Sequence, residues 1–174
     1  QLLVDPERTP PPASIPDLEY VAAAVFLSQK PKASSGEGRE TKVWDKAFIL
    51  EDLIRMNARE EFVKYIHNVS PIPMVQPEDS EEDYAKAVFL AASQHLLFWR
   101  SQGTIFLSDF QGSGCFLTDC QIMSNPALTP GNDNANMFGD GNVAQGFDNF
   151  PKEHICNVWC SWFGLEPFGQ TDID

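Results

Sequence analysis

The most restrictive feature of this sequence is a group of potential metal ligands near its carboxyl end, in the segment 152–164. A histidine there is followed by two cysteines, at His154, Cys156 and Cys160. If the end of the segment is helical, the two cysteines share a face, and all three side chains can converge on one metal ion. A structural zinc ion takes four protein ligands, so the fold must bring a fourth one from elsewhere.

The fourth ligand can be sought among the two remaining histidines, His67 and His95. We favour His95, because it lies on the apolar stripe of an expected helix, and we keep His67 as the second choice because its neighbours are polar. The alternative is that Cys156 and Cys160 are small buried hydrophobic residues that bind no metal.

Composition narrows the class of protein. The chain has 174 residues, which suits one domain, and no apolar run approaches the roughly 20 residues that span a bilayer. The amino end does not have the pattern of a secretory signal, so we expect the four cysteines to be reduced and the protein to be cytoplasmic. We expect an extended tail at 1–16, a single domain at 17–168 and a short tail at 169–174.

The charge balance bears on partners. The chain has 25 acidic and 12 basic residues, which gives a formal net charge of −13. Such a surface repels phosphate backbones, so we expect no nucleic acid partner, and it would attract a basic protein. Acidity that only keeps the chain soluble is the simpler explanation.

Hydrophobic patterns predict an α+β fold. The alanine-rich segment 18–29 predicts a helix, 30–46 a polar loop, and 48–54 a strand paired with 61–66. A long helix is expected from Asp79 or Ser80 to about Trp99, with an apolar stripe that includes His95 and Trp99. A turn at 101–103, a strand at 104–112, a short hairpin returning through 115–119 and a loop at 124–137 complete the pattern.

Two carboxylates and an amide gather around the end of the 104–112 strand. Asp109 and Gln111 close this strand, and Asp119 follows eight residues after Gln111. Oxygen ligands of this kind suit Mg²⁺ and the phosphates that it carries. Taken alone, the same acids are more often turn formers or a helix cap.

A glycine-rich stretch follows at 138–147, with Gly139, Gly141, Asn142 and Gly146. The spacing before the third glycine is too long for the dinucleotide-binding fingerprint, and no strand precedes it. A nucleotide site of the Rossmann type is therefore not expected. The glycines still allow close approach of the backbone to a bound peptide or phosphate.

Taken together, these segments resemble the alpha-kinases, a family of atypical protein kinases, and are nearest to its elongation-factor-kinase and myosin-heavy-chain-kinase branch. The resemblance covers about 48–168 and lies in four stretches, 62–68, 108–122, 138–142 and 154–165. It implies the carboxyl lobe of a protein serine/threonine kinase, with an amino lobe that is largely absent from this sequence.

The resemblance also implies roles for individual residues. It implies a structural Zn²⁺ held by His95, His154, Cys156 and Cys160. Asp109 would orient the substrate hydroxyl and assist its deprotonation, while Gln111 and Asp119 would hold Mg²⁺ against the phosphates of ATP. Adenine would meet Glu51 and the backbone near Ile54. The loop from Gly139 to Gly146, including Gly141 and Asn142, would lie beside the peptide substrate.

The sequence departs from the family pattern at several places. Neither Lys30 nor Lys32 follows an expected strand, so no lysine is assigned to the ATP phosphates. The family's Thr-Asp-Pro reads Thr118-Asp119-Cys120 here, its Lys-Tyr-Asn reads Lys64-Tyr65-Ile66, and the loop 30–46 is an insertion.

Two rival hypotheses stand beside the kinase. One is a catalytically inactive, kinase-like scaffold or binding module that lacks the lobe with the ATP lysine. The other is a zinc-stabilised interaction domain with no kinase ancestry, which requires the grouping of Asp109, Gln111 and Asp119 to be accidental.

Overall fold

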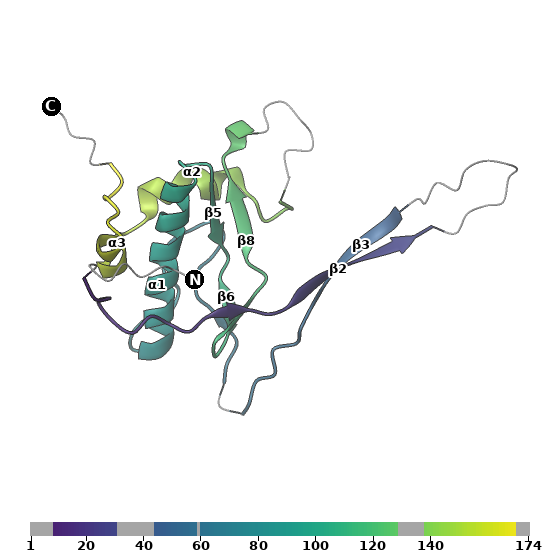
Figure 1. Ribbon diagram of the computed structural model, residues 1–174, viewed down its shortest axis with the longest axis horizontal. Coiled ribbons are helices and arrows are strands. Elements are labelled where there is room, and N and C mark those ends of the chain that lie inside the picture. The colour runs from purple at the N-terminus through teal and green to yellow at the C-terminus, as the bar shows by residue number, and fades with distance from the viewer. Residues whose placement is uncertain (1–8, 31–43, 59, 129–137, 170–174) are drawn as a thin grey trace, which may run out of the picture.

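The computed structural model describes residues 9–30, 44–58, 60–128 and 138–169. One long helix, α1, runs through the centre of the main body, with strands on one side and smaller helices at its end and flank (Figure 1). The helices are α1 (Glu81–Arg100), α2 (Ala144–Glu153) and α3 (Val158–Trp162), with a short 3-10 turn η1 (Pro126–Leu128). This mixture of segregated helices and mainly antiparallel strands confirms the α+β class.

The largest sheet has four short strands in the order β1-β7-β6-β4. The strands are β1 (Glu19–Tyr20), β7 (Phe116–Thr118), β6 (Gln111–Ser113) and β4 (Val63–Lys64). β1 runs parallel to β7, and the other pairs are antiparallel. The expected hairpin through Gly114 is the β6–β7 pair.

The strand expected at 104–112 is interrupted. β5 (Ile105–Ser108) pairs with β8 (Gln121–Ser124), a strand that the sequence pattern did not predict. β6 then pairs within the four-stranded sheet. The break falls at Asp109, whose φ of 61° is in the left-handed region. One residue in this conformation redirects the chain from one sheet to the other.

The prediction of a helix at 18–29 was wrong, because β1 and β2 (Ala23–Gln29) occupy this segment. β2 pairs antiparallel with β3 (Trp44–Glu51), so the expected pairing of 48–54 with 61–66 was also wrong. Cross-strand neighbours such as Phe26 and Phe48 outweigh the helix propensity of the alanines. Most of the expected loop 30–46 lies outside the described residues, but 44–46 belong to β3.

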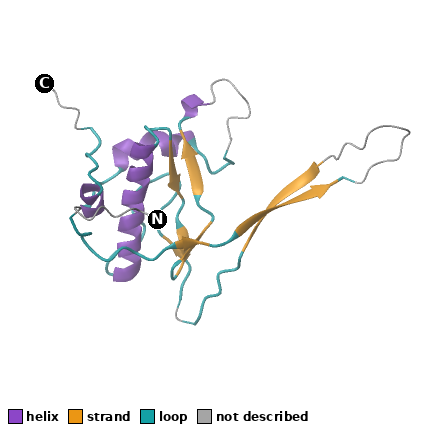
Figure 2. Cartoon of the chain, in the orientation of Figure 1, coloured by secondary structure: helices purple, strands orange, loops and turns teal. Residues whose placement is uncertain are grey.

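The β2–β3 ribbon projects from the main body (Figure 2). Nearly all of its residues are exposed, including the large apolar side chains of both faces. An isolated two-stranded ribbon is only marginally stable in water. Because it packs on little else, the ribbon gains little stability from the rest of the described chain.

Helix α1 forms as its sequence predicts. The Ser80 hydroxyl accepts a hydrogen bond from the backbone N–H of Asp83, and three acids occupy the first turn. His95 is buried, as the stripe predicts, but Trp99 is 60% exposed and does not belong to the buried face. The helix ends at Arg100, and the turn expected at 101–103 follows with positive φ at Gln102 and Gly103.

Three hydrophobic clusters pack around α1. One lies beneath the four-stranded sheet and contains Tyr65, Leu90 and Leu117. A second joins α1 to α3, and a third joins β5 and β8 to α2. Buried Gln94 on α1 donates hydrogen bonds to the Leu107 carbonyl and to Ser108 Oγ at 2.9 and 3.0 Å, which fixes β5 against the helix.

The described part of the amino-terminal segment has no regular structure from residue 9 to 18, and it crosses to α3, where Trp162 Nε1 donates to the Thr9 carbonyl at 2.8 Å. Within the described ranges, no helix is long and apolar enough to cross a membrane.

Candidate functional site

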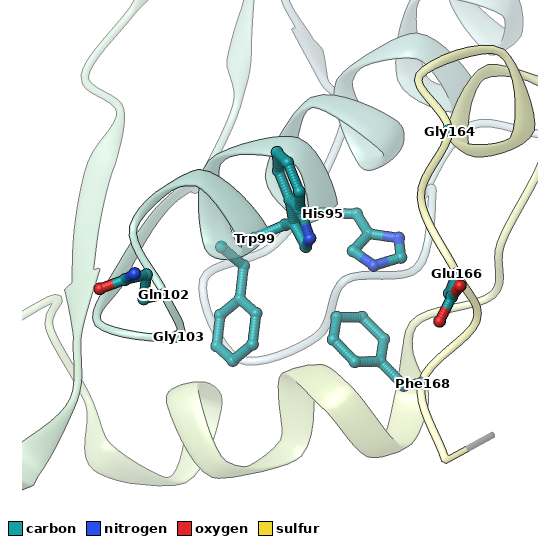
Figure 3. Close-up of a pocket in the computed structure, with 8 residues that line it drawn as sticks. His95, Trp99, Gln102, Gly103, Gly164, Glu166 and Phe168 are labelled. Atoms are coloured by element: carbon teal, nitrogen blue, oxygen red, sulfur yellow. The ribbon is translucent and has the colours of Figure 1, made fainter. Parts of the chain in front are cut away.

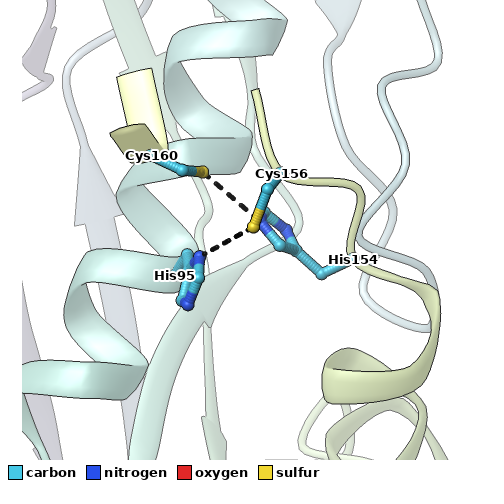
Figure 4. A group of neighbouring side chains, drawn as sticks. All are labelled: His95, His154, Cys156 and Cys160. Atoms are coloured by element: carbon cyan, nitrogen blue, oxygen red, sulfur yellow. Dashed lines mark hydrogen bonds between the residues drawn. The ribbon is translucent and has the colours of Figure 1, made fainter. Parts of the chain in front are cut away.

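Four potential metal ligands meet between α1 and the segment that leads into α3 (Figure 4). Their ligand atoms all lie within 4.8 Å of one another, and they belong to His95, His154, Cys156 and Cys160. Cys156 Sγ lies 3.5 Å from His95 Nδ1, and Cys160 Sγ lies 3.5 Å from His154 Nε2. The structure thus brings His95 to the group, while His67 is exposed and its Nδ1 accepts from the backbone N–H of Val69.

The local fold holds this group differently from the helical face that the spacing predicts. Cys156 precedes α3 and is not on it, because Asn157 is the N-cap and its side chain accepts from the N–H of Trp159. The Asn157 amide also donates to the Val88 carbonyl at 3.0 Å, which ties the segment to α1. At the other end, Gly164 has a φ of 72°, as expected of a helix-ending glycine.

Burial shifts the proton equilibria of this group when no ion is bound. It lowers the pKa of His154 to about 4, with His95 contributing, and it lowers the pKa of His95 itself. It raises the pKa of Cys160 to about 11. Neutral imidazoles are the form that binds metal, whereas a buried thiol needs a cation beside it to ionise.

The residues fit a zinc ion. A tetrahedral zinc with bonds of about 2.3 Å to sulfur and about 2.0 Å to nitrogen separates sulfur and nitrogen ligands by about 3.5 Å. Both nearest sulfur–nitrogen separations in the group are 3.5 Å. The group could therefore hold one ion after a small contraction.

A second group of polar side chains crosses the four-stranded sheet. Lys64, Gln111 and Thr118 are paired in register on β4, β6 and β7, so their side chains share one face. Lys64 Nζ lies 2.6 Å from Asp109 Oδ1 and donates to Gln111 Oε1 at 3.2 Å. The Gln111 amide donates to Asp119 Oδ2 at 3.2 Å. The structure thus brings Asp109, Gln111 and Asp119 together, as the sequence predicts.

Both acids of this group have strained backbones. Asp109 has a φ of 61° and Asp119 a φ of 52°, in the left-handed region that costs a residue other than glycine about 1 kcal/mol or more. Aspartate tolerates this conformation better than most residues do, so the two φ values are compatible with turn formation as well as with a functional role.

The predicted adenine contacts lie beside this face. Glu51 ends β3, and its carboxylate accepts a hydrogen bond from the Thr118 hydroxyl on the polar face. Ile54 lines a cavity of about 510 Å³, whose walls also include Tyr20, Asp52 and Phe116. Phe116 and Thr118 are two residues apart on β7, so this cavity adjoins the polar face.

Hydrogen bonds hold the glycine-rich stretch against β8 and against Asn68. The Asn68 amide donates to the Gly141 carbonyl at 3.2 Å. Asn142 Nδ2 donates to Ser124 Oγ, on β8, at 2.7 Å. A Cβ at Gly141 would lie 2.2 Å from Gln121 Oε1, so the backbone approaches β8 closely there. Gln121 pairs with Ser108, the residue before Asp109. The stretch therefore lies next to the acid group.

The extent of the glycine loop needs correction. Gly139 and Gly141 lie in turns, but Gly146 is buried in α2, where a Cβ would lie 2.6 Å from the Asn68 carbonyl oxygen. The expected loop from Gly139 to Gly146 thus ends where α2 begins, at Ala144. Because Gly146 has no side chain, α2 can pack closely against the backbone of Asn68.

Sequence reasoning missed Lys64 and Thr118 as members of the polar group. Lys64 was noted only as part of a motif, although a lysine in a short β-segment between apolar residues was a visible signal. Its partner Asp109 lies 45 residues further along the chain, and only the sheet brings them together. The contact between Glu51 and Thr118 likewise joins distant segments.

Comparison with known proteins identifies the fold. The alpha-kinase domain of myosin-II heavy chain kinase A, solved in complex with AMP-PNP, superposes with a TM-score of 0.56 and 20% identity over 91% of this chain and 49% of that one. A truncated alpha-kinase domain of myosin heavy chain kinase gives a TM-score of 0.54, with 20% identity over 90% of this chain and 50% of that one. The described chain therefore has an alpha-kinase-like fold that corresponds to about half of those domains.

Sequence comparison identifies the family. The family model described as the alpha-kinase family matches residues 7–160, so the chain belongs to the alpha-kinase family. The eukaryotic elongation factor 2 kinases of Homo sapiens and Mus musculus are 36% identical to it over 78 residues, which is 44% of this chain and 10% of theirs. The chain thus spans about a tenth of the length of these relatives. Family membership removes the rival hypothesis of an interaction domain without kinase ancestry.

Proposed function

We propose that this chain carries the catalytic face of an alpha-type protein serine/threonine kinase, which transfers the γ-phosphoryl group of ATP to a hydroxyl of a protein. The observation that carries the proposal is the connected group on one sheet face, in which Lys64 contacts Asp109 and Gln111, and Gln111 contacts Asp119. Family membership agrees with this activity.

Asp109 is proposed to orient the attacking hydroxyl. Its ion pair with Lys64, at 2.6 Å, holds the side chain in place. The hydroxyl oxygen would bond to the γ-phosphorus as the bond to the ADP oxygen breaks, and its proton would pass to Asp109. Lys64 would act as a positioning residue for Asp109.

Gln111 and Asp119 are proposed to bind the Mg²⁺ that accompanies ATP. The Gln111 amide nitrogen lies 3.2 Å from Asp119 Oδ2 and donates to it. If the amide turned, its oxygen would face the carboxylate, and the two groups could share one ion. This turn would remove the hydrogen bond to Asp119 and the one that Gln111 Oε1 accepts from Lys64 Nζ.

The base and ribose of the nucleotide are proposed to occupy the cavity of about 510 Å³ beside Ile54, with the Asp52–Arg55 backbone as one wall. Glu51 would mark the boundary between this cavity and the phosphate end of the site, because its carboxylate contacts Thr118. The turn with Gly139, Gly141 and Asn142 would lie beside the peptide substrate, because Gly141 packs on Gln121 near Asp109.

The four-ligand group is proposed to bind a structural Zn²⁺. The ion would be held by His95 from α1, by His154 and Cys156 from the segment that leads into α3, and by Cys160 on α3. It would join these two parts of the chain at the edge of the cluster that contains Trp159. It would neutralise the two thiolates and take no part in phosphoryl transfer.

The proposed substrate is a basic protein, since the net charge of −13 favours cationic partners and disfavours nucleic acid. We place the protein in the cytoplasm, with no membrane attachment. The four cysteines are all free, which agrees with a reducing compartment.

Nucleotide titration tests the proposal against a catalytically inactive scaffold. Isothermal titration of the 174-residue chain with ATP and Mg²⁺ is expected to show micromolar binding that requires Mg²⁺. Asp119→Asn should weaken the part of the ATP affinity that depends on Mg²⁺. The matched control is Asp148→Asn, at an exposed position on α2, which should bind normally. Absence of binding would favour the scaffold.

A phosphorylation assay tests the chemistry. With a library of basic peptides that each contain one serine or threonine, Asp109→Asn should lower transfer by about 10²–10⁴-fold while ATP binding persists. Asp148→Asn is again the control. Undiminished transfer by Asp109→Asn would remove the role assigned to this residue.

Metal analysis tests the zinc site independently. One zinc ion per chain is expected, and a chelator should lower the thermal midpoint, because the binding energy of such a site is folding energy. Cys156→Ser should abolish metal binding, whereas Cys115→Ser, outside the group, should not. Unchanged metal content in Cys156→Ser would contradict the assignment.

A further inference from the structure

A second cavity of about 510 Å³ lies at the carboxyl end of α1 (Figure 3). It opens between the last turn of α1 and the segment that follows α3. Its lining includes His95, Phe98, Trp99, Glu166 and Phe168. Its volume is in the range of sites that bind small ligands or single side chains with their neighbours.

The walls of this cavity are aromatic and well supported. Phe98 packs against Phe106 and Phe150, with ring centroids 6.2 and 5.3 Å apart. Phe168 packs on the ring of His95 at 4.2 Å and on Phe98 at 5.5 Å. Contacts with core side chains thus fix the rings of Phe98 and Phe168, and their arrangement does not depend on a ligand.

Trp99 is the exposed part of this aromatic surface. It is 60% exposed, although its position in the helical pattern predicts burial. Its ring lies 5.9 Å from the guanidinium carbon of Arg100, within the range of a cation–π contact. The indole is thus largely exposed, although the neighbouring Arg100 guanidinium lies over its ring.

The charges around the cavity favour a cation. Glu166 lines it and has no salt bridge or hydrogen bond within the part of the chain that the structure describes. No lysine or arginine is among the lining residues, and the whole chain has a net charge of −13. A ligand that combines a planar cation with an apolar stem would pair with the carboxylate and stack on the rings.

We propose that this cavity is a docking site for an arginine side chain of a protein partner. The guanidinium group stacks against Trp99 or Phe168 and pairs with Glu166, while the flanking residues of the partner cover the rim. Lysine fits less well, because an ammonium ion is more strongly hydrated and lacks a planar face.

The site is distinct from the proposed catalytic face. Tyr65, next to Lys64, reaches Asp83 in the first turn of α1, whereas Trp99 is in the last turn. The cavity shares no lining residue with the polar group of Lys64, Asp109, Gln111 and Asp119. The inference therefore does not rest on the proposed kinase activity.

The experiment is a titration followed by the indole N–H signals of the 15N-labelled 174-residue chain. The probes are the peptide acetyl-Gly-Leu-Arg-Leu-Gly-amide and its citrulline analogue, which has nearly the same shape without the charge. Trp99→Phe identifies the Trp99 signal. The arginine peptide should shift that signal saturably, and the citrulline peptide should bind about tenfold more weakly.

Matched variants locate the binding. Glu166→Gln should weaken the arginine peptide about two- to fivefold, as expected for an exposed ion pair. Glu78→Gln, an exposed acid outside the cavity, should leave it unchanged. Equal binding of the two peptides, no saturable shift of the Trp99 signal, or equal binding by Glu166→Gln would each overturn the proposal.

Discussion

Gly112, at the centre of β6, provides the sharpest test of the sheet that carries the polar group. It pairs with Leu117 on β7. A Cβ at this position would lie 1.9 Å from the carbonyl oxygen of Phe116 and 3.0 Å from the Leu117 Cα. Both atoms belong to the backbone, so no side chain can turn away to make room. Gly112→Ala must therefore separate the two strands.

The size of this effect can be worked from the geometry. Relief of the overlap needs a separation of about 1.5 Å, which takes the nearest ladder hydrogen bonds beyond bonding distance. Loss of two or three bonds, each contributing about 1 kcal/mol, gives a destabilisation of about 2–4 kcal/mol. The Gln111–Asp119 contact, now 3.2 Å, should be lost as well, so Mg²⁺-dependent ATP binding should weaken.

Equilibrium urea unfolding measures this change, and Gly114→Ala is the matched control in the same hairpin. Gly114 has a φ of +60°, and its nearest neighbour to an added Cβ is Glu60 Oε1 at 3.8 Å. Alanine there should cost only about 1–2 kcal/mol, from backbone strain. If Gly112→Ala were no more destabilising than Gly114→Ala, the close packing of β6 on β7 would be wrong.

Three further predictions follow from burial. Phe150→Ala should destabilise the chain by about 3–5 kcal/mol in urea unfolding, whereas Phe26→Ala, on the exposed ribbon, should cost far less, and equal costs would contradict the core assignment. Backbone amides of β2 and β3 should exchange with deuterium well before those of α1, as mass spectrometry can measure; equal protection would mean that the ribbon is covered. Burial raises the pKa of Tyr65 to about 12, so the stability that its neutral hydroxyl contributes is fully present below about pH 10 and is lost as the pH rises towards 12. Tyr65→Phe should therefore flatten the dependence of the unfolding free energy on pH between about 10 and 12. An unchanged dependence would show that other groups cause it.

Features with a local chemical signal were predictable from the sequence. Ser80, the acids after it and the apolar stripe define α1, and the spacing of His154, Cys156 and Cys160 points to a metal group. The choice between His95 and His67 was also sound, because the helical pattern places His95 on a buried face. Zinc itself stays a prediction.

Features that depend on distant partners were not predictable. The segment 18–29 reads as a helix in isolation, and only β3, beyond a long insertion, makes it a strand. The ion pair between Lys64 and Asp109 depends on the alignment of β4 with β6. Helix α2 was missed because its glycine, asparagine and proline weaken the local pattern, while Phe147 and Phe150 find their contacts in the β5–β8 pair.

The packing of α3 against α1 has a consequence for biosynthesis. Ala92 of α1 shares its cluster with Trp159, Cys160 and Leu165, which leave the ribosome more than sixty residues later. One side of α1 must therefore stay uncovered in the nascent chain until residues 159–165 have been made. A premature stop codon before Trp159 would leave that side permanently open, and such a product should be a substrate for chaperones and proteases.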